Sequence, residues 1–169
     1  MNLNNLFQNF CKKNNLEINS YQLTVIDELK SYYKLNFNKS ILNKFFSKNN
    51  SRLAFYLHGG VGVGKTMILN FFFDLVEEKK LRQHFNEFML SFHDFAHERK
   101  ENNEENVINQ FVKNLKSQTK LIYFDEFQVT NIVDAMILGK LFEQIFKENI
   151  KIILTSNTKI SELYKDGLQ

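Results

Sequence analysis

The sequence predicts an α/β fold in which helices flank a parallel β-sheet, and three observations lead to it. From Leu53 onward, short apolar runs alternate with stretches of helical periodicity, which is typical of βαβ units. A glycine-rich segment, Gly59 to Gly64, separates the first apolar run from the first of these helical stretches. A later apolar run, Leu121 to Phe124, ends directly in two acidic residues. We therefore expect a sheet whose polar groups gather where its strands end.

The expected elements of this core follow from apolar patterning. Strands are expected, in chain order, at 53–57, 85–92, 121–124 and 151–155. Helices are expected at 65–79 and over a polar stretch at 94–116, and another helix should begin with Thr130 or Asn131 as its cap. Asp134 then falls in the first turn of that helix, where a negative charge suits the helix dipole.

The first fifty residues differ from the rest, and we expect an N-terminal helical segment (1–50) followed by the sheet-bearing core (51–169). Tyr21, Ile26, Leu29 and Tyr33 recur at helical spacing after the cap-like pair Asn19-Ser20, which predicts a helix near 20–35. Apolar residues at 41–46 indicate a second, short helix.

Composition narrows the class of protein. With 169 residues, 43% of them hydrophobic and 24% charged, the chain is typical of one soluble globular domain. It has neither an apolar run long enough for a membrane span nor a signal peptide, so a cytoplasmic location is expected. The single cysteine, Cys11, excludes an internal disulfide. The net charge is +3, but the lysines are interleaved with acids and do not indicate a nucleic-acid surface.

The glycine-rich segment matches the phosphate-binding motif G-x-x-x-x-G-K-[ST] at every position. It consists of Gly59, Gly60, Val61, Gly62, Val63, Gly64, Lys65 and Thr66. Glycines let successive backbone N–H groups point inward, and the following helix adds the partial positive charge of its N-terminus. Lys65 can then reach the outer phosphates of ATP, while the Thr66 hydroxyl can coordinate Mg²⁺. The motif and its strand-to-helix position predict a P-loop nucleotide-binding fold.

The acidic strand end supplies the second half of such a site. Asp125 follows four apolar residues, and we expect it to hold Mg²⁺, mainly through the water of the ion. Glu126 is the candidate general base for an attacking water. Asn157 follows the fourth strand and is a candidate sensor that orients this water, although it can also simply form a turn. His93 and His97 are spaced i, i+4 but lack the glutamate of H-E-x-x-H, which does not favour a metal site.

Beyond the phosphate loop, longer runs of sequence resemble one family. The runs LHGGVGVGKTMILNFFF, HFNEFMLSFH, FDEFQVTNIVDAMILGKLFE and TSN…ELYKDGLQ are similar to the ZapE family, AAA+-related ATPases of bacterial cell division with mitochondrial relatives. The resemblance covers about residues 20–169. It implies an ATPase that remodels a protein partner such as the division ring, with oligomers among full-length relatives. It also implies that Gln22 approaches the nucleotide base.

The resemblance also has departures. Asn70 and Asn131 stand where the family usually has aspartate, and members continue past the final Gly-Leu-Gln through a fifth strand, arginines and a lid. The AAA+ order places that fifth strand beside the first, so we expect the first strand to be an edge. Because Arg52 and Arg82 precede predicted strands, we expect only Arg99 to reach the phosphates.

Binding should then survive better than turnover, because a transition-state arginine contributes about 10³- to 10⁵-fold to the rates of such enzymes. Two alternatives remain. In the first alternative to an active ATPase, the chain is a non-catalytic nucleotide-binding remnant or half of a split gene. In the second, it is a module like a DNA-helicase loader, which would bind DNA with steep salt dependence.

Overall fold

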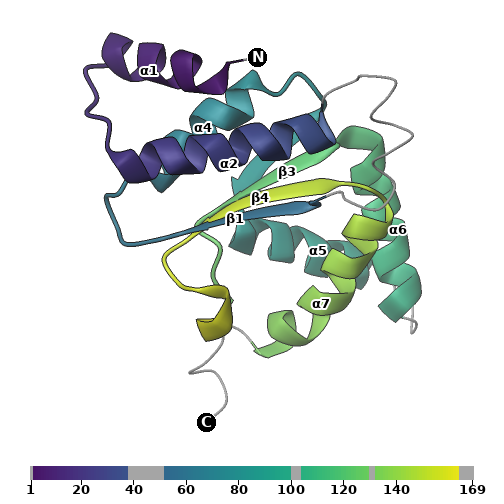
Figure 1. Ribbon diagram of the computed structural model, residues 1–169. Coiled ribbons are helices and arrows are strands. Elements are labelled where there is room, and N and C mark those ends of the chain that lie inside the picture. The colour runs from purple at the N-terminus through teal and green to yellow at the C-terminus, as the bar shows by residue number, and fades with distance from the viewer. Residues whose placement is uncertain (1, 38–51, 100–103, 130–131, 164–169) are drawn as a thin grey trace.

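The computed structural model describes residues 2–37, 52–99, 104–129 and 132–163 (Figure 1). Its centre is a parallel sheet of four strands in the order β1-β4-β3-β2. The strands are β1 (Ala54–His58), β2 (Lys80–His84), β3 (Leu121–Asp125) and β4 (Lys151–Ser156). The predicted α/β class is confirmed. Within the described residues β1 and β2 are the two edges, and the central strands β3 and β4 are buried along their whole length.

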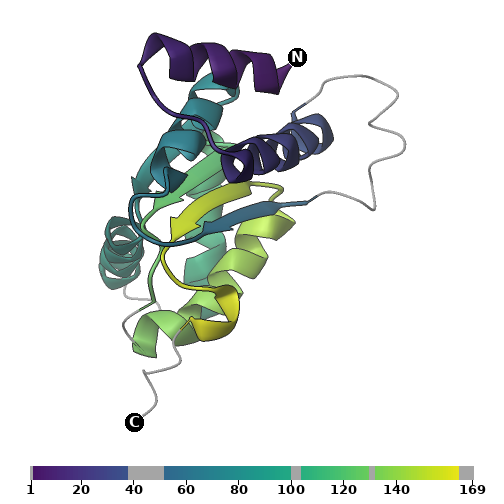
Figure 2. The same ribbon diagram turned by 60° about the vertical axis from the view of Figure 1, so that its left-hand side comes forward.

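Helices cover both faces of the sheet and give three layers (Figures 1 and 2). One face is covered by α2 (Ser20–Asn36) and α4 (Lys65–Leu75), and α1 (Leu3–Lys13) packs on the outside of these two helices; the three share one apolar cluster. The other face is covered by α5 (Phe85–Arg99), α6 (Glu104–Gln118) and α7 (Ile132–Lys147), which share a second. Beyond β4 the chain makes a short 3-10 turn, η2 (Ile160–Glu162). None of the helices in the described ranges is long and apolar enough to cross a membrane.

The expected helix near 20–35 is α2, and its cap is the predicted one. The Asn19 side chain accepts a hydrogen bond from Gln22 N, and the Gln22 side chain accepts one from Asn19 N, which completes a capping box. Helix α1 was not predicted. Its apolar residues Leu3, Phe7 and Cys11 are buried at i, i+4 spacing, so Cys11 is a core residue. The short helix expected at 41–46 and the cap expected at 130 or 131 lie outside the described residues.

The second strand was predicted in the wrong place. Residues 85–92 belong to helix α5, and the strand is the polar segment Lys80–His84. Phe85, Phe88, Met89 and Phe92 are spaced i, i+3, i+4, i+7 and are all buried, which is helical periodicity. The strand lacks an apolar run because it lies at the edge of the sheet and stays partly exposed. The polar stretch expected at 94–116 is divided between the end of α5 and α6.

The topology brings the polar strand ends together. All four strands are parallel, so the C-terminal ends of β1, β3 and β4 lie at one edge of the sheet. The chain leaves β1 at this edge, forms the glycine-rich loop and enters α4, so the N-terminus of α4 lies there too. In an open α/β sheet this edge is where ligands bind.

Candidate functional site

The glycine-rich loop has a backbone that only glycine accommodates easily. Gly62 and Gly64 have φ angles of 80° and 89°, in the left-handed region. A Cβ atom at Gly64 would also lie 3.0 Å from Gln22 Nε2. Gly64 is the residue before α4, so the loop delivers the chain directly into that helix. The unpaired N–H groups of a helix N-terminus therefore lie beside the loop, as an anion site requires.

Lys65 lies within the loop and reaches the end of β4. Its Nζ donates hydrogen bonds to Gly59 O at 2.8 Å, to Gly60 O at 2.7 Å and to Asn157 Oδ1 at 3.0 Å. Two loop carbonyls and an amide thus hold the ammonium group at the mouth of the loop. The structure brings Asn157 to this cation from a position 92 residues along the chain. Such a positive charge can bind the outer phosphates of a nucleotide.

Thr66 and Asp125 meet beside the loop. Thr66 Oγ1 donates to Asp125 Oδ1 at 3.2 Å, which joins the first turn of α4 to the end of β3. The same Oδ1 accepts hydrogen bonds from Thr155 Oγ1 at 2.8 Å and from the Tyr123 hydroxyl at 3.3 Å. Tyr123 lies two residues before Asp125 on the same strand, so their side chains share one face of the sheet.

Arg82 also contacts Asp125, although the sequence analysis predicted a different position for it. We expected Arg82 to precede a strand at the opposite edge of the sheet. It lies instead in the middle of β2, opposite Tyr123 in the register. Its Nη2 is 2.6 Å from Asp125 Oδ2, and its guanidinium lies over the Tyr123 ring at 5.1 Å. The misplaced second strand caused this error, because the true strand begins five residues earlier than predicted.

These contacts keep Asp125 ionised although it is buried. Burial alone raises the pKa of the Asp125 carboxyl, but the hydrogen bonds from Arg82 and Thr155, together with the charge of Arg82, outweigh it. The pKa therefore lies below its ordinary value. Burial, followed by the charge of Asp125, raises the pKa of Tyr123, so its hydroxyl remains a donor. An ionised, oriented carboxylate is the form that a cation requires.

The oxygens at this edge fit Mg²⁺. The described residues hold no group of three or more His, Cys, Asp or Glu side chains able to bind a metal alone. A hydroxyl from Thr66 and a carboxylate from Asp125 are therefore the protein ligands on offer. Mg²⁺ usually binds through one or two protein oxygens together with water and phosphate oxygens, rather than in an all-protein cage. The ligand set suits a metal that arrives with a nucleotide.

Glu126 has a strained backbone at the same edge. Its φ is 56°, in the left-handed region that non-glycine residues rarely adopt, and its N–H donates to Thr155 Oγ1 at 3.0 Å. Its side chain is exposed, next to the buried side chain of Asp125. Backbone strain of this kind is concentrated at functional sites. The turn leaves a carboxylate directed to solvent one residue beyond a candidate metal ligand.

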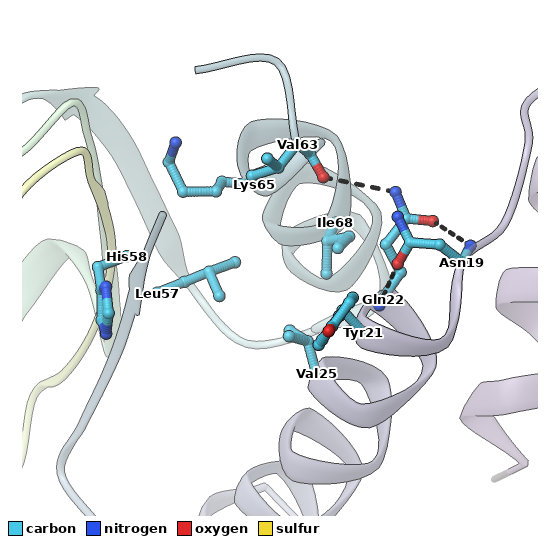
Figure 3. Close-up of a pocket in the computed structure, with 9 residues that line it drawn as sticks. All are labelled: Asn19, Tyr21, Gln22, Val25, Leu57, His58, Val63, Lys65 and Ile68. Atoms are coloured by element: carbon cyan, nitrogen blue, oxygen red, sulfur yellow. Dashed lines mark hydrogen bonds between the residues drawn. The ribbon is translucent and has the colours of Figure 1, made fainter. Parts of the chain in front are cut away.

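A largely apolar pocket of about 250 Å³ adjoins the loop (Figure 3). It is lined by Asn19, Tyr21, Gln22, Val25, Leu57, His58, Val63, Lys65 and Ile68. Gln22 Nε2 lies 3.5 Å from Val63 O, so the start of α2 contacts the loop from the side (Figure 3). Apolar walls with a few amide groups can receive a flat heterocyclic base. The pocket is thus lined by Gln22 from α2 and by Val63 and Lys65 from the glycine-rich loop and the start of α4.

Two functional neighbours escaped the sequence analysis besides Arg82. The Thr155 hydroxyl is hydrogen-bonded to both the Asp125 carboxylate and the Glu126 backbone N–H, and the Tyr123 hydroxyl is hydrogen-bonded to the Asp125 carboxylate. Tyr123 could have been found, because a residue two positions before a strand-end acid must share its face. The structure places His93 on helix α5. Its Nε2 lies 2.7 Å from Asp134 Oδ1, so the pair joins α5 to α7.

Comparisons with known proteins agree with this architecture. Lactation elevated protein 1 homolog B of Danio rerio is 41% identical over 133 residues, which are 73% of this chain and 26% of that protein. Cell division protein ZapE of Escherichia coli K12 is 40% identical over 117 residues, which are 68% of this chain and 30% of that protein. The chain therefore spans less than a third of the length of these relatives.

Solved structures show the fold. A DNA replication initiation factor matches with a TM-score of 0.58 and 15% identity, over 86% of this chain and 40% of that one. DnaI matches with a TM-score of 0.54 and 17% identity, over 91% of this chain and 78% of that one. At these identities the likenesses show the fold alone, a parallel sheet flanked by helices. A family model for AFG1-like ATPases matches residues 8–169, and the chain therefore belongs to the AFG1-like ATPase family.

Proposed function

We propose that this chain binds ATP with Mg²⁺ at the carboxyl edge of its sheet and hydrolyses it. The proposal rests on two side-chain contacts, which join the start of α4 to the ends of β3 and β4. Lys65 Nζ lies 3.0 Å from Asn157 Oδ1, and Thr66 Oγ1 lies 3.2 Å from Asp125 Oδ1. A phosphate-binding cation, a metal-binding hydroxyl and carboxylate, and a polar amide thus surround one loop.

Each group then has a role. The backbone N–H groups of Gly59–Gly64 and Lys65 hold the phosphates, while Thr66 and Asp125 hold the metal. Mg²⁺, when bound, neutralises charge that develops on the transferred phosphate. Glu126 accepts a proton from the attacking water.

Two further groups position the reactants. Asn157 orients the attacking water, and Gln22 contacts the base in the adjoining pocket. The side chains of Val61 and Val63 are exposed, and in this proposal the two residues contribute their backbone N–H groups to phosphate binding.

The wider role is a second part of the proposal, and the relatives support it. We propose that the full-length protein works in the cytoplasm and couples ATP turnover to remodelling of a protein partner. The name of the bacterial relative, a cell division protein, supports the division machinery as that partner. A mixed surface charge, with a net charge of only +3, does not favour nucleic acid as the substrate.

The direct test is a fluorescence titration with a labelled ATP analogue and Mg²⁺. Lys65→Ala should weaken binding at least about tenfold, because the bound phosphates lose a charged partner. The matched control is Lys140→Ala, which removes the same charge from an exposed pair with Glu104 and should bind like the wild type. Equal affinity of all three proteins would refute the site. Binding without any phosphate release would favour the non-catalytic alternative.

A further inference from the structure

The two oxygens of the Asp125 carboxylate have different partners. Oδ1 accepts hydrogen bonds from the hydroxyls of Thr66, Thr155 and Tyr123. Oδ2 faces the guanidinium of Arg82 at 2.6 Å. Lys65, the nearby cation of the loop, is bonded instead to two loop carbonyls and to Asn157. The ion pair that the structure gives Asp125 is therefore the one with Arg82.

The Arg82 side chain is placed so that it can leave. The side chain of Asp125 is only 8% exposed, whereas that of Arg82 is 41% exposed. Arg82 projects from β2, an edge strand of the described sheet, and its guanidinium contacts Asp125 Oδ2 and the face of the Tyr123 ring. Moving the guanidinium into solvent breaks one ion pair and one cation–π contact but leaves the apolar core intact.

Without a metal, the positive charge of Arg82 compensates the negative charge of Asp125. A buried carboxylate needs a positive partner, because removing that partner leaves an uncompensated charge in a poorly solvated place. Arginine cannot lose its proton in a protein, so its charge stays on Oδ2 at any ordinary pH.

With a metal, the same arginine is a competitor. A guanidinium in contact with a ligand carboxylate repels a divalent cation and withdraws charge from the oxygens that the cation needs. The conflict can be relieved only by movement of the guanidinium.

We propose that Arg82 is the resting counter-ion of Asp125, and that a divalent cation displaces it when metal and nucleotide bind. This inference rests on the proposed function, since it assumes that Asp125 belongs to the metal site. Arg82 then sets the metal affinity of the site: it stabilises the empty state and is exchanged for the ion. The cation requirement of nucleotide binding is the property that this exchange controls.

The displacement can be followed in the wild-type protein. Arg52, Arg82 and Arg99 are the three arginines of the chain, so an arginine side-chain ¹⁵N NMR spectrum has three Nε–H signals. Arg52→Lys and Arg99→Lys identify the Arg82 signal by elimination. We expect this signal to move when Mg²⁺ and ADP are added together, and to stay when ADP is added with EDTA. An Arg82 signal that stays fixed while Mg·ADP binds would overturn the proposal.

A variant measures the competition. Mn²⁺ bound in the presence of ADP, detected by electron paramagnetic resonance, should half-saturate Arg82→Gln at about one fifth of the wild-type concentration, because a repelling charge is gone. Arg82→Lys keeps the charge and should stay close to the wild type. The matched control Arg52→Gln removes an arginine from an exposed pair with Glu28 and should change nothing.

The outcomes separate the two proposals. Unchanged or weaker Mn²⁺ binding by Arg82→Gln would mean that Arg82 is a fixed support of Asp125, which contradicts displacement. If Arg82→Gln fails to fold, the wild-type NMR titration decides. Absence of any saturable Mg·ADP binding by the wild type would instead refute the proposed function.

Discussion

Two buried charged residues lie at opposite ends of the central strands, at the carboxyl edge and the amino edge of the sheet, and their surroundings differ. Asp125 ends β3 at the carboxyl edge, and Lys151 begins β4 at the amino edge. Both are nearly inaccessible to water, at 6% and 9% exposure. Asp125 is surrounded by donors and a guanidinium. Lys151 Nζ donates to two acceptors of Asn149, at 2.9 Å to its carbonyl and 2.6 Å to its side chain, and within the described residues it has no ion pair.

The pKa values record this difference. Burial raises the pKa of Asp125, but Arg82 and Thr155 reverse the effect, so its charge is held in place. Burial, followed by the positive charges of Lys116 and Lys120, lowers the pKa of Lys151 to about 8. Hydrogen bonds at the carboxyl edge stabilise the charged form of Asp125. At the amino edge, burial and neighbouring lysines disfavour the charged form of Lys151. In the proposed function, the charge held at the carboxyl ends of the strands is the one that the bound metal uses.

The largest expected effect comes from removing the charge at the carboxyl edge. Asp125→Asn keeps the shape of the side chain but not its charge, so phosphate release should fall about 100- to 1,000-fold. The Mg²⁺ dependence of nucleotide binding should weaken as well. Lys151→Met removes a buried charge at the other edge and should leave both properties unchanged. Equal losses in the two variants would contradict the division between the edges.

Glu126 sharpens the comparison within the carboxyl edge. Glu126→Gln should lower turnover by about 100-fold or more, because the amide cannot accept the proton of the attacking water. Binding of Mg·ATP should be retained, since the Glu126 side chain is exposed and the metal ligands are untouched. Turnover and binding are measured on the same preparation. A parallel loss of both would make Glu126 a structural or metal-binding residue.

Much of this architecture was predictable from the sequence. The strong apolar runs at β3 and β4 are read directly, because central strands of a parallel sheet are buried on both faces. The edge strand β1 was also predicted from an apolar run, although it is only partly buried. The phosphate loop was predictable because its glycine pattern reflects backbone geometry that Gly62 and Gly64 display.

The prediction of the edge strand β2 was wrong, and so was the position that it gave to Arg82. Lys80–His84 is polar because one of its sides faces solvent, so the apolar run in α5 was mistaken for the strand. The error removed Arg82 from the site. Contacts such as Arg82 with Asp125 depend on register between strands 43 residues apart, which no local pattern contains.

The amino edge predicts a pH dependence of stability. In the unfolded chain Lys151 titrates near 10.5, and in the fold near 8, so the unfolded chain binds more protons between these values. The free energy of unfolding should therefore rise from about pH 8 to pH 10.5, by up to about 3 kcal/mol from this residue. Lys151→Met should be more stable than the wild type at pH 7.5, and this advantage should shrink towards pH 10 in urea unfolding.

Comparing variants isolates that effect. Burial raises the pKa values of Tyr32 and Tyr123, so both lower stability at high pH, but they do so in both proteins and cancel in the difference. Lys140→Met, in an exposed pair with Glu104, should differ from the wild type by less than about 0.5 kcal/mol throughout. A pH-independent difference between Lys151→Met and the wild type would show that Lys151 is not destabilising by its charge.

The smallest expected effect concerns the hydroxyl that joins the two acids of the carboxyl edge. Thr155 Oγ1 donates to Asp125 Oδ1 and accepts from Glu126 N, and the residue is 1% exposed. Thr155→Val keeps the volume but leaves a buried acceptor and a strained backbone N–H without this partner, so unfolding free energy should fall by about 1–2 kcal/mol. Thr155→Ser keeps the hydroxyl and should lose less, which separates hydrogen bonding from packing in urea unfolding. A loss as large in Thr155→Ser would mean that the methyl group, rather than the shared hydroxyl, supports this edge.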